Sequence, residues 1–355
     1  MGRSIKSARF WSAVVIAVMV TALLIVVAVG CGDDTTTTTK TATTKAAGQA
    51  NGKIYVAVTG SGEATAGTGP MGYAVVDLKT KKVEMVNLPD SKAPHGIIFT
   101  ADTKTAPRTA GKVTTEQPKG IYIGNATDGS VLKVDLSDNK VTKTITDKPG
   151  IKVCGMQMGP DGLIYLSAMA DGKAYPLDGS TDTIGDAKLG GAPNTNSICG
   201  VSWTLDNKYV YLSNMSDPKN PTGAGFVAKY EWPSGAFVKR IENVTKPSPT
   251  GATLAHQSEM TPDGKYLYVM DSIDGAVVKI DTATDEIVKT VPVGKDPHAM
   301  VFSSDGKTGY IAVRKEPDEK SSSIFVYDVE KDQVIDRIPG IPVPQVCSLI
   351  LWEQN

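Results

Sequence analysis

The chain has 355 residues, with 37 lysines and arginines against 38 aspartates and glutamates, three histidines and four cysteines. A formal net charge of -1 at pH 7 leaves no excess of basic residues. The composition therefore argues against a nucleic-acid-binding protein, which needs a face rich in lysine and arginine. About 40% of the residues are hydrophobic, so the chain can bury a substantial core.

The first 30 residues predict a signal peptide. Arg3, Lys6 and Arg9 precede an uncharged run from residue 10 to residue 30, and this order of basic and apolar regions is typical of an export signal. About 20 apolar residues can also span a bilayer, so an uncleaved membrane anchor is the alternative. Under either interpretation the rest of the chain lies on the extracytoplasmic face of a cell membrane.

The apolar run ends in Ala28, Val29, Gly30 and Cys31. Small residues directly before a cysteine resemble the lipobox of bacterial lipoproteins, although Ala28 stands where leucine is more usual. The resemblance implies that Cys31 carries the lipid and becomes the mature N-terminus, so that the membrane is a partner of the protein. Residues 31–50 are rich in threonine, alanine and lysine and bury too little apolar surface to fold. We interpret them as a tether to a single domain at residues 51–355.

The domain consists of repeated four-strand units. Three predicted strands, at residues 53–58, 72–78 and 82–88, come first, and the clearest complete units follow much later, at residues 255–294 and 297–340. Each complete unit has an apolar run, an Asp-Gly turn and three further strands separated by turns. Four strands per unit make the blade of a β-propeller, so we predict an all-β propeller.

Two sets of acidic residues define the register of the repeat. One aspartate follows the first strand of five units, and one acidic residue marks the third strand of all six. The first set is Asp102, Asp161, Asp206, Asp263 and Asp305, and the second is Asp77, Asp135, Asp178, Glu231, Asp281 and Asp328.

The last predicted strand, residues 346–352, has no blade after it, and the three N-terminal strands have no inner strand before them. Pairing the C-terminal strand with these N-terminal strands completes a blade and leaves no open edge between the termini. We therefore predict a ring of six blades. A seventh blade, hidden by a weak repeat, is the alternative.

Residues 263–294 closely resemble the YVTN type of propeller repeat, found in the YVTN and lactonase-like superfamily. The resemblance is strong over the last two blades and extends across about residues 52 to 352. It implies the propeller fold and says little about chemistry, because propellers host many unrelated functions. A lactonase-like hydrolase is one function that it suggests, but the chain lacks the carboxylate cluster that a calcium-dependent lactonase needs.

All three histidines, and the three cysteines other than Cys31, fall at one position of the repeat, the second residue of the first strand. Since the first strand of each blade lines the central channel, these six side chains are predicted to form a ring near its mouth. The following residue is small in five units and Gln257 in the sixth, which allows the backbones to approach closely. The ring is His95, Cys154, Cys199, His256, His298 and Cys347.

Imidazole and thiolate groups are ligands for soft to borderline transition metals. Around the ring they divide into two neighbouring triads. Cys154, Cys199 and His256 form a thiolate-rich triad, with Met169 and Met215 in adjacent loops as additional thioether ligands. The other triad, His298, Cys347 and His95, is the His2Cys donor set of electron-transfer copper sites.

We expect copper, with zinc as the alternative cofactor. The mixed donor set and the exported location favour copper, and so does the resemblance of the fold to propellers that bind copper through channel histidines, as in nitrous oxide reductase. The function is then redox chemistry on a small molecule or with a redox partner, or the capture of a metal. An open site would favour the first and a closed site the second.

Two further interpretations remain open. In one, Cys154 and Cys199 form a disulfide, the histidines are packing residues, and the propeller binds a protein or a cell-wall component. The other concerns Glu259, three residues beyond the ring position, which is the candidate proton acceptor if the protein is an enzyme.

Overall fold

The structure is a computed structural model that describes residues 51–60, 69–100, 112–215, 223–247, 255–314 and 320–354. The predicted signal peptide, Cys31 and the tether lie outside these ranges. Within them every regular element is a β-strand, and no helix there is long and apolar enough to cross a membrane. All of the described ranges belong to one compact unit, Lys45–Asn355.

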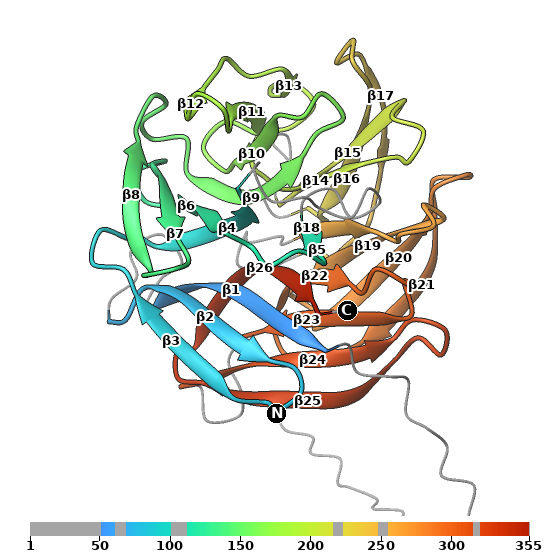
Figure 1. The fold of residues 1–355 in the computed structure, drawn as a ribbon. Coiled ribbons are helices and arrows are strands. Elements are labelled where there is room, and N and C mark those ends of the chain that lie inside the picture. The colour runs from blue at the N-terminus through green and yellow to red at the C-terminus, as the bar shows by residue number, and fades with distance from the viewer. Residues whose placement is uncertain are drawn as a thin grey trace, which may run out of the picture. The chain divides into compact units, whose positions relative to one another are not determined.

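The strands of the described ranges form six sheets, whose inner strands gather around a common centre in Figure 1. From the centre outward, the first blade is β26 (Gln345–Glu353), β1 (Gly52–Gly60), β2 (Gly72–Asp77) and β3 (Val83–Asn87). The second is β4 (Pro94–Phe99), β6 (Gly120–Asn125), β7 (Val131–Asp135) and β8 (Lys140–Ile145). The third is β9 (Val153–Met158), β10 (Ile164–Ala168), β11 (Lys173–Asp178) and β12 (Thr183–Ile184), with β13 (Leu189–Gly190) also paired to β11.

The remaining three blades follow the same order. The fourth is β14 (Ile198–Trp203), β15 (Tyr209–Asn214), β16 (Phe226–Glu231) and β17 (Phe237–Ile241). The fifth is β18 (Ala255–Met260), β19 (Tyr266–Asp271), β20 (Ala276–Asp281) and β21 (Glu286–Pro292). The sixth is β22 (Pro297–Phe302), β23 (Thr308–Val313), β24 (Ser322–Asp328) and β25 (Gln333–Ile341).

The C-terminal strand closes the ring, as the repeat predicts. β26 pairs antiparallel with β1, from Gln345 opposite Gly60 to Glu353 opposite Gly52. The short strand β5 (Val113–Thr114) adds to the far end of β26 in parallel. The predictions of six blades and of closure by the C-terminal strand are confirmed, and the described residues contain no seventh blade.

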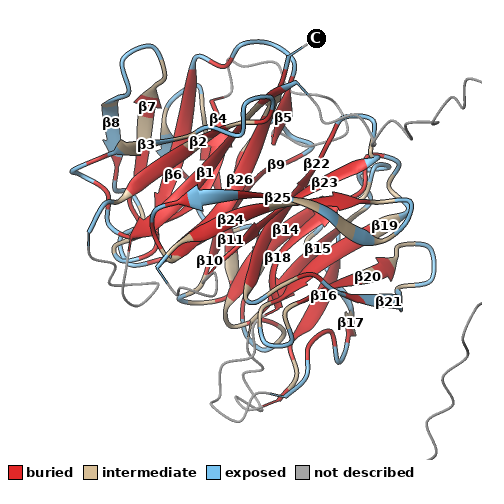
Figure 2. Cartoon of the chain, turned by 90° about the horizontal axis from the view of Figure 1, so that it is seen from below, coloured by how far each residue is buried: buried red, intermediate tan, exposed pale blue. Residues whose placement is uncertain are grey.

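Burial decreases from the channel to the rim of each blade. The inner strands β4, β14, β18 and β22 are buried at every residue, whereas β21 is exposed at all but one of its seven residues. Figure 2 shows this difference as red inner strands and pale blue segments on outer strands such as β8. The inner strands are buried on both faces because they pack against one another around the axis, so polar side chains on them have little access to water.

Adjacent blades are joined by a repeated cluster of tyrosine, lysine and aspartate. Tyr211 on β15 and Lys229 on β16 both contact Asp285, in the β20–β21 turn of the next blade, at 2.7 Å and 2.9 Å. Asp285 adopts a φ of 59°, a left-handed conformation that aspartate tolerates better than most residues. The same arrangement joins Tyr122 and Lys133 to Asp182, and Tyr268 and Lys279 to Asp332.

We expect Asp285→Ala to destabilise the propeller by about 1–3 kcal/mol, because it leaves a largely buried ammonium and a tyrosine hydroxyl without an acceptor. Asp285→Asn should cost less, since the amide keeps an acceptor for Tyr211. Asp138→Ala, which removes an exposed ion pair with Lys140, should change stability by less than about 1 kcal/mol. Urea unfolding of the three variants tests this order, and equal midpoints for both Asp285 variants and the wild type would contradict it.

Candidate metal centre

Each of the six ring residues lies at a β-bulge in its inner strand. In β4, Pro94 pairs with Asn125 and Gly96 with Gly124, so His95 is the extra residue of the ladder. The pairing skips in the same place in all of the other inner strands. A bulge bends the strand and turns one side chain away from its regular direction. The bulge therefore turns the ring residue of every inner strand in a common direction. Regular strand pairing would not produce this orientation.

The small residues after the ring position leave room for neighbouring inner strands. A Cβ atom added to Gly155 would lie 2.2 Å from the carbonyl oxygen of Cys199, and one added to Gly200 would lie 2.5 Å from the amide nitrogen of Ser258. Both distances are far below van der Waals contact. The predicted reason for these glycines, close approach of the backbones, is confirmed.

The structure brings the ring residues together in the two predicted triads. The donor atoms of His95, His298 and Cys347 lie within 4.8 Å of one another, and those of Cys154, Cys199 and His256 do so as well. All six residues are buried. The triads adjoin at the rings of His256 and His298, whose centroids are 3.6 Å apart and whose planes are tilted by 44°.

Cys347 is a free thiol in a strongly polar environment. The Arg314 Nη2 atom donates to its sulfur at 2.7 Å, and the Thr59 hydroxyl lies 3.0 Å from it. Burial raises the pKa of the Cys347 thiol, but Arg314 and the imidazoles of His95 and His298 lower it by more. The net pKa is well below its usual value, so Cys347 is a thiolate at neutral pH, the form that binds metals.

The two histidines of this triad present free nitrogen atoms. His95 has Nδ1 3.3 Å from the carbonyl oxygen of Ala93. Because a carbonyl only accepts, this bond places the proton on Nδ1 and leaves the Nε2 lone pair free. His298 is completely buried, yet neither of its ring nitrogens has a hydrogen-bond partner. An unsatisfied buried imidazole is rare, and a metal ion would satisfy it.

Asp296 lies beside this histidine, with Oδ1 3.6 Å from His298 Nδ1. Burial raises the pKa of Asp296, whereas His298 and Arg314 lower it, and the net direction is downward. The carboxylate is therefore ionised. A carboxylate behind a metal-binding histidine is a common way to orient the ring and strengthen it as a ligand.

The second triad is in a different state from the one its residue types suggested. Cys154 and Cys199 are joined in a disulfide, with Cα atoms 5.0 Å apart. In this state the two sulfurs carry no thiolate charge, so the structure shows the disulfide alternative, and metal binding by this triad stays a prediction. His256 remains, buried and with Nδ1 unpartnered. Burial lowers its pKa well below the usual range, and His298 and Arg314 lower it further, so the imidazole is neutral.

Met169 and Met215 stand at the position of their blades that is equivalent to Arg314 in the sixth blade. The amides of Met169, Met215 and Arg314 each donate to the carbonyl oxygen of the residue two before the ring position, at 3.0 Å, 2.8 Å and 3.1 Å. Both methionines are half-buried. Thioether ligation by them stays a prediction.

Glu259 forms a buried ion pair with Lys112, at 2.8 Å between Nζ and Oε2. Burial raises the pKa of Glu259 and Lys112 lowers it in part, so that the net direction is upward. Lys112 directly precedes β5, at the far end of β26 from Cys347. This ion pair favours a structural role for Glu259 in closing that end of the channel, and catalysis by Glu259 stays a prediction.

Sequence reasoning missed Arg314, Thr59 and Asp296. Arg314 follows the second strand of its blade and Thr59 lies near the end of one, and both contact Cys347 only through closure of the ring, so no local spacing indicates them. A signal for Asp296 was present, since it lies two residues before His298 and directly before β22.

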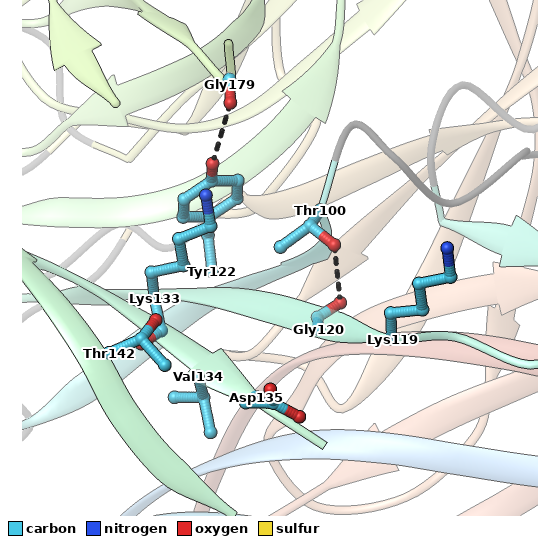
Figure 3. A pocket seen from close by; sticks show the side chains of 9 residues that line it. All are labelled: Thr100, Lys119, Gly120, Tyr122, Lys133, Val134, Asp135, Thr142 and Gly179. Carbon is cyan, nitrogen blue, oxygen red and sulfur yellow. Dashed lines mark hydrogen bonds between the residues drawn. The ribbon is translucent and has the colours of Figure 1, made fainter. Parts of the chain in front are cut away.

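A surface cavity of about 360 Å³, shown in Figure 3, is separate from the ring. It is lined by Lys119, Tyr122, Lys133, Asp135 and five smaller neighbours. Tyr122 donates there to the carbonyl oxygen of Gly179. None of the residues that line this cavity belongs to the ring, so it offers no route for a substrate to the six donors.

Comparison with known proteins supports the fold. No protein-family model matches the chain, and no curated protein matches it. Among solved structures, it is similar to Kuenenia stuttgartiensis hydrazine synthase, with 19% identity, a TM-score of 0.50, and coverage of 75% of this chain and 80% of that one. A chain of a nidogen/laminin complex is also similar, with 10% identity, a TM-score of 0.61, and coverage of 84% and 97%. At such low identities these likenesses show the propeller fold alone.

The thiolate of Cys347 makes a testable contribution to stability. A thiol whose pKa is depressed in the folded state stabilises that state fully above its unfolded pKa, about 8.5, and less as pH falls through the folded pKa. We expect the difference in unfolding free energy between wild type and Cys347→Ser, measured without metal, to fall by up to about 1.4 kcal/mol per pH unit below pH 8.5.

Urea unfolding between about pH 6 and pH 9 measures this difference. Arg314→Met serves as the control, because without the guanidinium the pKa of the thiol rises and the difference should depend less on pH. A difference that is constant with pH in the wild-type background would contradict an ionised Cys347.

Proposed function

We propose that this chain is a lipid-anchored, extracytoplasmic propeller that captures copper and holds it as copper(I) among His95, His298 and Cys347. The donor types, two imidazoles and one thiolate, suit copper. They come from three inner strands whose bulges turn them to one place in the channel. A bound copper ion would accept electron pairs from all three side chains.

One observation carries the proposal. His298 is completely buried and makes no hydrogen bond at either ring nitrogen, with the Asp296 carboxylate 3.6 Å from Nδ1, and it lies next to a cysteine whose pKa is lowered. A packing histidine would hydrogen-bond at least one nitrogen, because an unsatisfied buried polar group costs about 1–3 kcal/mol. A packing cysteine would be neutral. The missing hydrogen bonds of His298 and the lowered pKa of Cys347 are both explained if the two side chains serve as metal ligands.

The charges of the site favour copper(I) over zinc. Cys347 and Asp296 each carry one negative charge, and Arg314 carries one positive charge. If the imidazoles bind the metal through their lone pairs, one negative charge remains for the metal ion to compensate. Copper(I) would neutralise it, whereas a divalent zinc ion would leave a net positive charge, and buried net charge is costly.

The closed site favours capture of the metal over chemistry on a small molecule. Every residue of the triad is at most 1% exposed, which leaves little room for a substrate at the metal. The hydrogen bond from Arg314 to the sulfur would also favour the reduced ion, since it withdraws charge from the ligand. Electron exchange with a redox partner is the remaining redox function, because it requires no substrate pocket.

A second candidate is supported by the disulfide. If Cys154 and Cys199 are bonded for structural reasons, the propeller could bind a protein or a cell-wall component without a metal. This interpretation leaves the state of Cys347 and His298 unexplained.

The place of the protein in the cell is supported by sequence alone. The lipobox-like segment supports lipidation at Cys31, and the disulfide agrees with an exported protein. The YVTN type of repeat is supported by the tyrosines of the second strands, which join the blades at Tyr122, Tyr211 and Tyr268.

The full chain with Cys31→Ser, purified in detergent without chelator, should contain about one copper per chain in the disulfide-bonded state. Cys347→Ser and His298→Ala should each abolish this copper, because they remove ligands. Arg314→Met should weaken copper binding by about 10–100-fold, since it removes the group that orients and ionises the thiolate. Elemental analysis and titration against a chromogenic copper(I) chelator measure both effects.

Arg337→Met, at an exposed position of β25, is the matched control and should bind copper as the wild type does. A wild-type chain with an intact disulfide, a free Cys347 thiol and no affinity for copper(I) would refute the proposal and favour the interaction module.

A further inference from the structure

The disulfide lies in the same group of donors as an unused histidine. The sulfurs of Cys154 and Cys199 and a ring nitrogen of His256 are within 4.8 Å of one another. All three come from bulges of consecutive inner strands, β9, β14 and β18. A pair of cysteines that served only to join two blades would not require a histidine between them and the neighbouring metal site.

His256 provides an independent indication of a ligand. It is 5% exposed, and its Nδ1 atom has no hydrogen-bond partner. Its ring packs against that of His298, with centroids 3.6 Å apart and the planes at 44°, so its position does not rest on the two cysteines alone.

We infer that the Cys154–Cys199 disulfide blocks a second soft-metal site, which forms with His256 when the disulfide is reduced. The inference rests on the proposed function for its setting, since the two sites would adjoin in one channel. The oxidised chain would hold one metal ion, and the reduced chain would hold two. The redox state of one cysteine pair thus sets the metal capacity of the protein.

The reduction requires a dithiol as the reductant. Thiol–disulfide exchange transfers two electrons and two protons from the dithiol to Cys154 and Cys199, and the dithiol becomes a disulfide. Metal binding then releases the two protons from the thiols. The two thiolates formed in this way would place two negative charges in a buried site, and a bound cation would compensate them.

Access is limited, because both cysteines are completely buried. Reduction therefore depends on local opening of β9 and β14, which brief exposure to mild urea would promote. Slow exchange would keep the two forms of the chain distinct during a measurement.

The test compares copper(I) binding by the oxidised and reduced full chain carrying Cys31→Ser. The reduced form is prepared with dithiothreitol in urea below the unfolding midpoint, and reductant and urea are removed under argon. Alkylation should count one free thiol in the oxidised chain and three in the reduced chain. We expect bound copper(I) to double on reduction.

Variants separate the two sites. Cys347→Ser should bind no copper(I) when oxidised and one ion when reduced, whereas His256→Ala should bind one ion in both states. If reduced Cys347→Ser binds none, the second site is refuted and the first is unaffected. If the oxidised wild type binds none but reduced Cys347→Ser binds one, the proposed function fails and the second site stands.

Two other outcomes would also overturn the inference. One is a reduced wild-type chain, with three thiols counted, that binds no more copper(I) than the oxidised chain does. The other is a disulfide that dithiothreitol cannot reduce in the folded chain, because such a bond cannot control a site.

Discussion

The bulge at the ring residue of each inner strand is the constraint that brings the six ring side chains together. Regular pairing would alternate side chains between the two faces of each blade, whereas the bulge leaves one residue out of the ladder and turns it. Because this happens at the same position in six blades, residues far apart in the sequence meet at one level. The glycines after Cys154 and Cys199 are part of the same constraint, since the turned strands approach too closely for a Cβ atom.

Much of the fold and of the candidate site could be predicted from the sequence because each blade of a propeller repeats the same strand and turn pattern. The strand order, the closure by β26 and the grouping of six donors into two triads all follow from the register of the repeat. The oxidation state of Cys154 and Cys199 could not be predicted in this way, since a disulfide and a dithiol have the same sequence. Arg314 and Thr59 were missed for another reason. The contact of Arg314 with Cys347 crosses from the sixth blade to the first, and that of Thr59 depends on the pairing of β26 with β1.

Electrostatics divides the ring into unequal halves. Around Cys347, a guanidinium and a carboxylate accompany the histidines, so the thiol can ionise without a metal. Around Cys154 and Cys199 the structure describes no comparable cation, and there the sulfurs are joined to each other. With three thiols, one disulfide leaves one cysteine free, and that cysteine is the one beside Arg314.

Closure by the C-terminal strand also determines when the proposed copper ligands can meet. His95 belongs to the second blade, whereas Cys347 belongs to the last strand of the chain, which completes the first blade only by pairing with β1. During synthesis, Cys347 is therefore the last of the three side chains to arrive. A chain truncated before β26, or stalled with an open ring, would have its histidines but not the complete triad, so the triad forms only when the ring has closed.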